Sequence, residues 1–392
     1  MSTKLKLSSP TWPGFGGLEP GPLYDRIQTV PSRLNFKHLE KVALCARAQL
    51  GETTDSGLAC TIDPFSFTHG FNNVVLEVLF SDGVCWIARI QHGSMDMPGA
   101  LGDTRDLPSE ITTMRTVRDR TSIPVPQVFA HDVSPSNEFG HPYILMERVT
   151  GRVLEGPIAS QVPPEHLPKV AKQLADVLYQ LHGLTFDRLG QLWSGEKGGG
   201  PVEISPFYAQ RQADNRRALD GHLHDPEWTT ACWVLKTAVP HIIIEDRVRG
   251  PFPLCHLDLH HGNLLFDDDY NLRGVIDWSQ GQTVPVERLV VSPEFITFPA
   301  GSDEQNKNIR AFRALVHEHL QRLEGRESSA DNSPAFLLSN FFGSKRADIT
   351  HRCTYSFLHR ALWDGRLVAR LIYGDDVGWD QLLRVYGRTE VY

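Results

Sequence analysis

The sequence predicts a two-lobed α+β fold, in which a small lobe built on an antiparallel sheet precedes a larger and mainly helical lobe. A chain of 392 residues with 41% hydrophobic residues is long enough to bury two cores. β-rich runs lie before residue 150, and apolar residues at helical spacing dominate after it. We therefore expect an N-terminal arm and helix over 1–55, a sheet lobe over 56–149 and a helical lobe over 150–392.

Composition narrows the class of partner. The formal net charge of -8 lacks the basic excess that nucleic-acid binding requires, so no nucleic-acid partner is expected. Six scattered cysteines form no CxxC pair, which is typical of thiols in a reducing compartment. The first residues lack the apolar run of a signal peptide, and no run of about 18 apolar residues follows. The expectation is a cytoplasmic protein without a membrane partner, of unknown oligomeric state.

The first lobe shows helix and hairpin signals. Residues 1–35 are rich in Pro and Gly and predict an irregular arm. Residues 36–51 carry apolar side chains at helical spacing and end in a Gly, which predicts an amphipathic helix. The β-rich runs 72–80 and 84–90 flank an Asp-Gly pair at 82–83, so they should form a hairpin.

The remaining segments complete the sheet lobe and begin the helical one. A charged periodic segment over 109–122 predicts a helix that Pro124 ends, and two strands should follow over 126–133 and 143–149. Residues 150–156 then read as a linker. Beyond the linker the pattern is mostly helical, with Gly-rich loop sequence over 193–201 and helical stretches over 164–184, 207–249 and 305–386.

The segment CHLDLHHGNLLFDDD (255–269) concentrates the chemistry. His256, Asp258 and Asn263 fit the spacing HxDxxxxN, and Asp277 in GVIDW adds a second carboxylate. Between Asn263 and Asp277, the runs LLF and LRGVI flank the turn-like DDDYN. This pattern predicts a short β-hairpin that folds Asp277 back beside Asn263.

Three interpretations of this segment are open on spacing alone. Phosphoryl transfer needs a carboxylate that accepts the proton of the attacking hydroxyl, and oxygen ligands that hold Mg²⁺ against the phosphates. Alternatively, His256, Asp258 and His260 would point to one side of an extended segment and could bind zinc. A solvated turn with capping side chains would need no ion at all.

A resemblance favours the first interpretation. The segment PLCHLDLHHGNLLFDDDYNLRGVIDWSQ (253–280) resembles the catalytic and metal-binding segment of the aminoglycoside phosphotransferase family, whose fold is similar to that of protein kinases. Upstream, Glu110 resembles the helix glutamate that pairs with the nucleotide-binding strand, and PYILMERVTGRVL (142–154) resembles the hinge whose backbone holds adenine. The resemblance covers roughly residues 60–280.

The resemblance implies a kinase that uses ATP or GTP with Mg²⁺ to phosphorylate a hydroxyl, or less readily an amine, of a small molecule. Asp258 would be the base, assisted by Asn263, and Asn263 with Asp277 would hold the metal. The residues implied in nucleotide binding all lie in the sheet lobe: His69, Gly70, Phe71, Asn72, Arg89, Glu110, Glu147 and Val149.

Three departures from the family pattern keep alternatives open. Arg89 stands where kinases carry a lysine, the phosphate-covering turn over 67–73 has a single Gly, and His261 stands where proline is common. Arg89 and the single Gly of the turn motivate one alternative, a catalytically silent member that binds a nucleotide or metabolite. Reuse of the fold for another biosynthetic reaction is a further alternative, for which the sequence offers no positive evidence. The acidic residues of the second lobe are interleaved with Arg, so the aminoglycoside substrate is not transferred.

Overall fold

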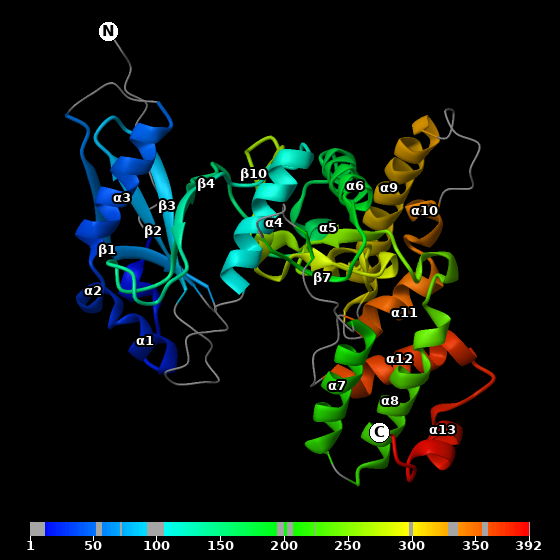
Figure 1. Ribbon diagram of the computed structural model, residues 1–392. Helices are drawn as coiled ribbons and strands as arrows, with labels where there is room; N and C mark the ends of the chain where they lie inside the picture. The colour runs from blue at the N-terminus through cyan, green and yellow to red at the C-terminus, as the bar shows by residue number, and fades with distance from the viewer. Residues whose placement is uncertain are drawn as a thin grey trace. The chain divides into compact units, whose positions relative to one another are not determined.

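The protein folds into two compact units, Met1–Arg115 with Pro126–Val149 and Thr116–Val125 with Thr150–Tyr392. The structure is a computed structural model (Figure 1) that describes residues 12–51, 57–70, 73–91, 106–193, 200–201, 207–222, 224–297, 301–327, 336–354 and 360–391. Helices and antiparallel strands occur in both units, so the predicted α+β class is confirmed.

The first unit is built on a five-stranded antiparallel sheet with the order β1-β2-β3-β5-β4. The predicted hairpin is confirmed, since Leu79 of β2 pairs with Cys85 of β3 across the turn. β1 was not predicted, because Pro64 and a register shift between Ile62 and Phe67 interrupt its alternation. The strands are β1 (Cys60–His69), β2 (Asn73–Phe80), β3 (Cys85–Gln91), β4 (Val128–Asp132) and β5 (Tyr143–Glu147).

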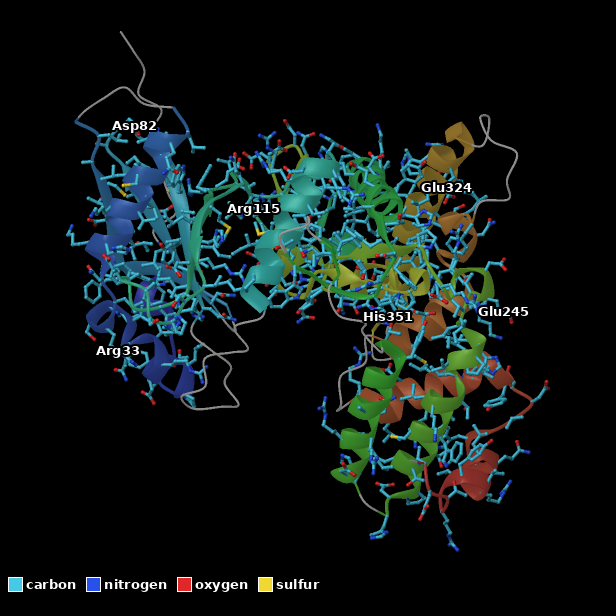
Figure 2. The ribbon with its side chains drawn as sticks, viewed as in Figure 1. Arg33, Asp82, Arg115, Glu245, Glu324 and His351 are labelled. Atoms are coloured by element: carbon cyan, nitrogen blue, oxygen red, sulfur yellow. The ribbon has the colours of Figure 1, made fainter. Side chains whose placement is uncertain are left out.

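Helices cover this sheet. The predicted helix is α3 (Phe36–Gln49) (Figure 1). Its Leu39 shares a buried cluster with apolar side chains of β2, β3 and β5. Asp82 lies on the β2–β3 turn (Figure 2). Arg47, near the end of α3, donates hydrogen bonds of 3.1 and 2.6 Å to the two carboxylate oxygens of Asp82. The expectation of an irregular arm was wrong in part, because residues 14–33 form short helices: η1 (Gly14–Gly17), α1 (Pro22–Ile27) and α2 (Val30–Arg33).

The second unit is mainly helical, as predicted. α4 (Asp106–Arg120) begins in the first unit and ends in this one. Within the second unit α6 packs against α9, and α8 packs against α12. Its helices are α5 (Ile158–Gln161), α6 (Leu167–Gly183), α7 (Phe207–Asp220), α8 (Pro226–Thr237), α9 (Asp303–Glu327), α10 (Leu338–Phe341), α11 (Lys345–Thr354), α12 (Ala361–Tyr373) and α13 (Trp379–Tyr386).

Short strands lie within the segment 256–277 of the second unit and on both sides of it in the chain. One sheet has the order β6-β9-β12-β7-β8, and a separate hairpin pairs β10 with β11. The sheet was not predicted, because strands of two to four residues are too short to show a period. The strands are β6 (Thr185–Phe186), β7 (Gly190–Trp193), β8 (Gly200–Pro201), β9 (Phe252–Cys255), β10 (Leu264–Phe266), β11 (Leu272–Val275) and β12 (Gln282–Thr283).

Among the parts of the chain that the structure describes, no helix combines the length and the apolar character that crossing a bilayer demands.

Candidate active site

The candidate site begins where the buried strand β9 ends and the chain enters the loop 256–263. His256 is 2% exposed, and its Nε2 lies 2.8 Å from the backbone oxygen of Ile276. Its ring meets that of Trp278 edge-on at 4.5 Å between centroids. Burial lowers the pKa of His256 below 6.5, so the ring is neutral near pH 7 and braces the loop.

A tight turn after His256 sets the direction of the Asp258 carboxylate. Leu257 has a φ of +32°, which non-glycine residues rarely adopt, and the N–H of Asp258 donates to the carbonyl of His256. The guanidinium of Arg288 donates to the carbonyl of Leu257 at 3.0 Å and stabilises the turn. The Asp258 side chain remains 38% exposed, so its carboxylate is accessible from solvent.

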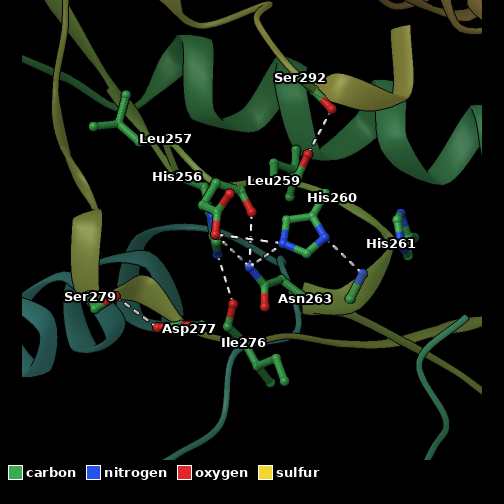
Figure 3. A network of polar contacts seen from close by, with 12 residues as sticks. His256, Leu257, Leu259, His260, His261, Asn263, Ile276, Asp277, Ser279 and Ser292 are labelled. Carbon is green, nitrogen blue, oxygen red and sulfur yellow. Dashed lines mark hydrogen bonds and ion pairs between the residues drawn. The ribbon is translucent and has the colours of Figure 1, made fainter. Parts of the chain in front are cut away.

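Asp258 shares contacts with two side chains of its own loop (Figure 3). Asn263, which is 8% exposed, directs its Nδ2 to the Asp258 carbonyl at 2.9 Å and to Oδ2 at 3.4 Å. The Nε2 of His260 lies 3.6 Å from the same Oδ2. Asp258 raises the pKa of His260 above 6.5, chiefly through this side-chain contact, whereas partial burial acts in the opposite direction.

The predicted β-hairpin is confirmed and places the second carboxylate. Leu264 of β10 pairs with Val275 of β11, and the N–H of Ile276 donates to the carbonyl of Asn263 at 3.0 Å. Asp277 follows at once with a φ of +60°, a left-handed conformation that Asp and Asn tolerate better than most residues. Its Oδ1 accepts a 2.8 Å hydrogen bond from Ser279 Oγ. Asn263 and Asp277 thus occupy the same end of one hairpin.

These side chains fit a hard divalent cation. Because the Nδ2 of Asn263 turns to Asp258, its Oδ1 points the other way (Figure 3). An amide oxygen and a carboxylate are ligands that suit Mg²⁺. The zinc interpretation does not fit, because it requires an extended segment, and the turn at Leu257, with a φ of +32°, breaks that extended conformation. In addition, the described residues contain no group of three His, Cys, Asp or Glu side chains that could hold a metal.

Side chains from residues 286–295 stabilise the loop 256–263 through hydrogen bonds. Ser292 Oγ donates to the carbonyl of Leu259 at 2.6 Å. The carboxylate of Glu294, 2% exposed, accepts from the N–H of His261 at 2.9 Å, contacts its Nδ1 at 2.7 Å and accepts from the N–H of Ile158 at 2.8 Å. His261, which departs from the pattern of the resembled family, is therefore fixed by hydrogen bonds. Sequence reasoning missed Ser292 and Glu294, since no motif connects them with the loop.

We expect Glu294→Ala to lower the free energy of unfolding by about 2–4 kcal/mol, because it leaves buried N–H groups without an acceptor. Urea denaturation measures the loss. Asp268→Ala is the matched control, since Asp268 is fully exposed and lies 3.9 Å from Arg152; its effect should stay within about 0.5 kcal/mol. Equal stabilities of the two variants would contradict this role of Glu294.

The first unit contains the residues that the resemblance implies in nucleotide binding. Arg89 of β3 forms an ion pair with Glu110 of α4, and both side chains are largely buried, at 10% and 2% exposure. Glu147 ends β5, where its carboxylate accepts from the N–H of Gln127 at 3.1 Å, and Val149 follows two positions later.

The phosphate-covering turn is described only at its edges. His69 ends β1 and pairs with Val74, and the N–H of Gly70 donates to the carbonyl of Asn73 at 2.9 Å. Phe71 and Asn72, also predicted here, lie outside the described residues. The structure therefore brings Arg89 and Glu110 together within the first unit, and Asp258, Asn263 and Asp277 within the second.

Comparison with known proteins identifies the family. The model of the phosphotransferase enzyme family matches residues 66–285, more than half of the chain, and this stretch contains every predicted site residue. The chain belongs to this family. The resemblance predicted from the sequence is confirmed, and phosphotransferase family membership supports phosphoryl transfer of the kinase type to a small molecule.

Individual relatives are distant. A Ralstonia eutropha protein assigned to the aminoglycoside phosphotransferases shares the fold with a TM-score of 0.51 at 15% identity, over 90% of this chain and 94% of that one. The probable acyl-CoA dehydrogenase IBR3 of Arabidopsis thaliana is 27% identical over 180 residues, 43% of this chain and 20% of that protein. Altered inheritance of mitochondria protein 9 of Candida albicans is 27% identical over 177 residues, 43% and 28% of the respective chains. The chain therefore aligns with less than a third of each of these two curated relatives.

Proposed function

We propose that this protein is a small-molecule kinase, which moves the terminal phosphoryl group of ATP or GTP to a hydroxyl with Mg²⁺ as cofactor. The observation that carries the proposal is the grouping of Asp258, Asn263 and Asp277 around one turn and one hairpin, in a chain of the phosphotransferase enzyme family. An amine acceptor is the less favoured variant of the same reaction.

In this proposal each residue of the loop has a separate task. Asp258 orients the acceptor hydroxyl and accepts its proton as the oxygen attacks phosphorus. Asn263 holds Asp258 through Nδ2 and offers Oδ1 to the metal, and Asp277 supplies the charged oxygen ligand. Bound Mg²⁺ would neutralise charge on the phosphate oxygens. His256 and Glu294 keep the loop in place during the reaction.

The residues of the first unit would bind the nucleotide. Arg89, braced by Glu110, would steady the phosphates, and backbone groups between Glu147 and Val149 would receive the base. A guanidinium keeps the positive charge of the usual lysine but binds two oxygens at once, so it suits phosphate. The phosphates would be covered by the turn that contains His69, Gly70, Phe71 and Asn72.

A catalytically silent, ligand-binding member is the second candidate. It is favoured by Arg89 in place of lysine and by the single glycine of the turn over 67–73, which lets fewer backbone amides approach the phosphates. The retention of Asp258, Asn263 and Asp277 favours the kinase, since a protein that only binds a ligand has no chemical need for all three.

A two-stage experiment separates the candidates. Calorimetry with Mg-ATP and Mg-GTP first measures binding, and release of inorganic phosphate measures turnover with water as acceptor. A metabolite extract is then screened for products that gain one phosphoryl mass. Phosphorylated product with wild-type protein, absent with Asp258→Ala, supports the kinase. Nucleotide binding without product from any acceptor pool supports the silent member.

A further inference from the structure

His260 (Figure 3) lies between the Asp258 side chain and the backbone of its own loop, and its two ring nitrogens contact different groups. Its Nδ1 accepts a 3.0 Å hydrogen bond from the N–H of Gly262 and so caps the short helix η4 (His261–Asn263). Its Nε2 lies 3.6 Å from Oδ2 of Asp258 and 3.4 Å from Nδ2 of Asn263, which itself donates to that Oδ2. No role follows for His260 from the sequence motif HxDxxxxN, which skips this position.

The backbone contact decides which nitrogen carries the proton of a neutral ring. Because Nδ1 accepts from the N–H of Gly262, its lone pair is used and the proton must sit on Nε2. The Nε2–H is then a donor on the side of the ring that faces Asp258. A separation of 3.6 Å is long for a hydrogen bond, as is common for catalytic contacts before substrate binds.

The ring is also held sterically. A Cβ atom at Gly262 would come within 2.7 Å of His260 Cε1, so the absence of a side chain at position 262 gives the imidazole its place. The side chain of His260 is 29% exposed, and its described neighbours include Gly262, His261, Asn263 and Asp258. The position of the ring is therefore coupled directly to the geometry of the loop.

We propose that His260 is a positioning residue for Asp258: its Nδ1 is locked by Gly262, and its Nε2–H holds Oδ2 so that the carboxylate keeps one orientation toward the acceptor. Asn263 donates to the same oxygen from another direction, so the two donors together restrict rotation of the carboxylate. The inference rests on the proposed kinase function, because it gives Asp258 the role of base. A reorientation of the base by about 1 Å can cost 100-fold in rate.

Two isosteric substitutions separate the two nitrogens of His260. His260→Asn keeps an oxygen near Nδ1 that can accept from Gly262 N–H, but its amide is too short to reach Asp258. His260→Gln extends an NH₂ group to the place of Nε2 and loses the Nδ1 acceptor. If His260 only stabilises the loop, His260→Asn should preserve both stability and turnover. If it positions Asp258, His260→Gln should preserve more turnover than His260→Asn.

The experiment measures thermal unfolding and the steady-state hydrolysis of Mg-ATP by the full chain. We expect His260→Asn to keep a wild-type Tm and to lose about 10- to 100-fold in kcat, with KM for Mg-ATP unchanged. His260→Gln should lower the Tm by a few degrees and retain the larger kcat. A wild-type kcat in His260→Asn, or a lower kcat in His260→Gln than in His260→Asn, overturns the inference.

Failure of the proposed kinase function would give a different result from failure of the positioning role of His260. It would appear as absent hydrolysis in the wild type, or as equal hydrolysis in the wild type and Asp258→Ala. The contact between His260 and Asp258 is then tested by unfolding alone, with His260→Ala, which removes both ring nitrogens, Asp258→Ala and the double variant. We expect the Tm loss of the double variant to differ from the sum of the single losses. Additive losses overturn the positioning role whether or not the protein turns over.

Discussion

Asp258→Ala is expected to lower turnover by about 10²- to 10⁴-fold, the range over which removal of a general base acts, and to leave the Kd of the nucleotide within about twofold. The reason is the separation of tasks along the loop. The carboxylate of Asp258 is 38% exposed and is held by Asn263 and His260, a geometry suited to meeting an acceptor hydroxyl. Phosphate release measures turnover, and calorimetry with Mg-ATP measures binding.

Asp269→Ala is the matched control, because Asp269 is another carboxylate of the same segment but belongs to the exposed tip of the β10–β11 hairpin. Its turnover should equal that of the wild type. Retention of wild-type turnover by Asp258→Ala would remove Asp258 from the role of base. A large loss in both variants would point instead to general damage of the hairpin.

The parts of the site that the sequence predicted are those that depend on neighbours along the chain. The turn-like DDDYN between two apolar runs predicted the hairpin, and the hairpin alone brings Asn263 and Ile276 into hydrogen-bond contact. Likewise, Asp82-Gly83 predicted the hairpin of β2 and β3. Local turn chemistry determines such contacts, so one sequence suffices to find them.

The parts that were missed depend on contacts between distant segments. Glu294 and Ser292 support the loop 256–263 across about thirty positions, and neither belongs to a recognisable pattern. The zinc interpretation failed for a related reason. It assumed an extended segment, whereas the turn at Leu257, with a φ of +32°, breaks the alternation that would align the three side chains.

The retention of this loop also bears on the departures in the sheet lobe. Arg89 keeps the ion pair with Glu110 that the resemblance implies for a lysine, so the exchange preserves the charge and its brace. In the second unit, His261 replaces the usual proline and is fixed by Glu294 instead. In both places a substitution relative to the family pattern coincides with a specific buried partner, which is the arrangement expected of a maintained site.

Asp277→Asn should weaken the Mg²⁺-dependent binding of ATP by about 10- to 100-fold, a range typical of metal-site substitutions. Asparagine is the informative replacement, because it tolerates the left-handed backbone at φ +60° and can still accept from Ser279 Oγ. The change therefore removes the negative charge and little else. Alanine at this position would add backbone strain of about 1–2 kcal/mol, so a loss of affinity could not be assigned to the missing charge alone.

The measurement compares the Kd of ATP with Mg²⁺ and with EDTA, for the wild type, Asp277→Asn and Ser279→Ala. Wild-type protein should bind more tightly with Mg²⁺, and Asp277→Asn should lose that difference while its affinity in EDTA stays the same. The Mg²⁺ dependence of ATP binding by Ser279→Ala should lie between those of the wild type and Asp277→Asn, because the hydroxyl orients Asp277 without reaching the metal itself. If Asp277→Asn retained the full Mg²⁺ dependence, the metal would have to be held by other side chains, and the hairpin would lose its role in phosphoryl transfer.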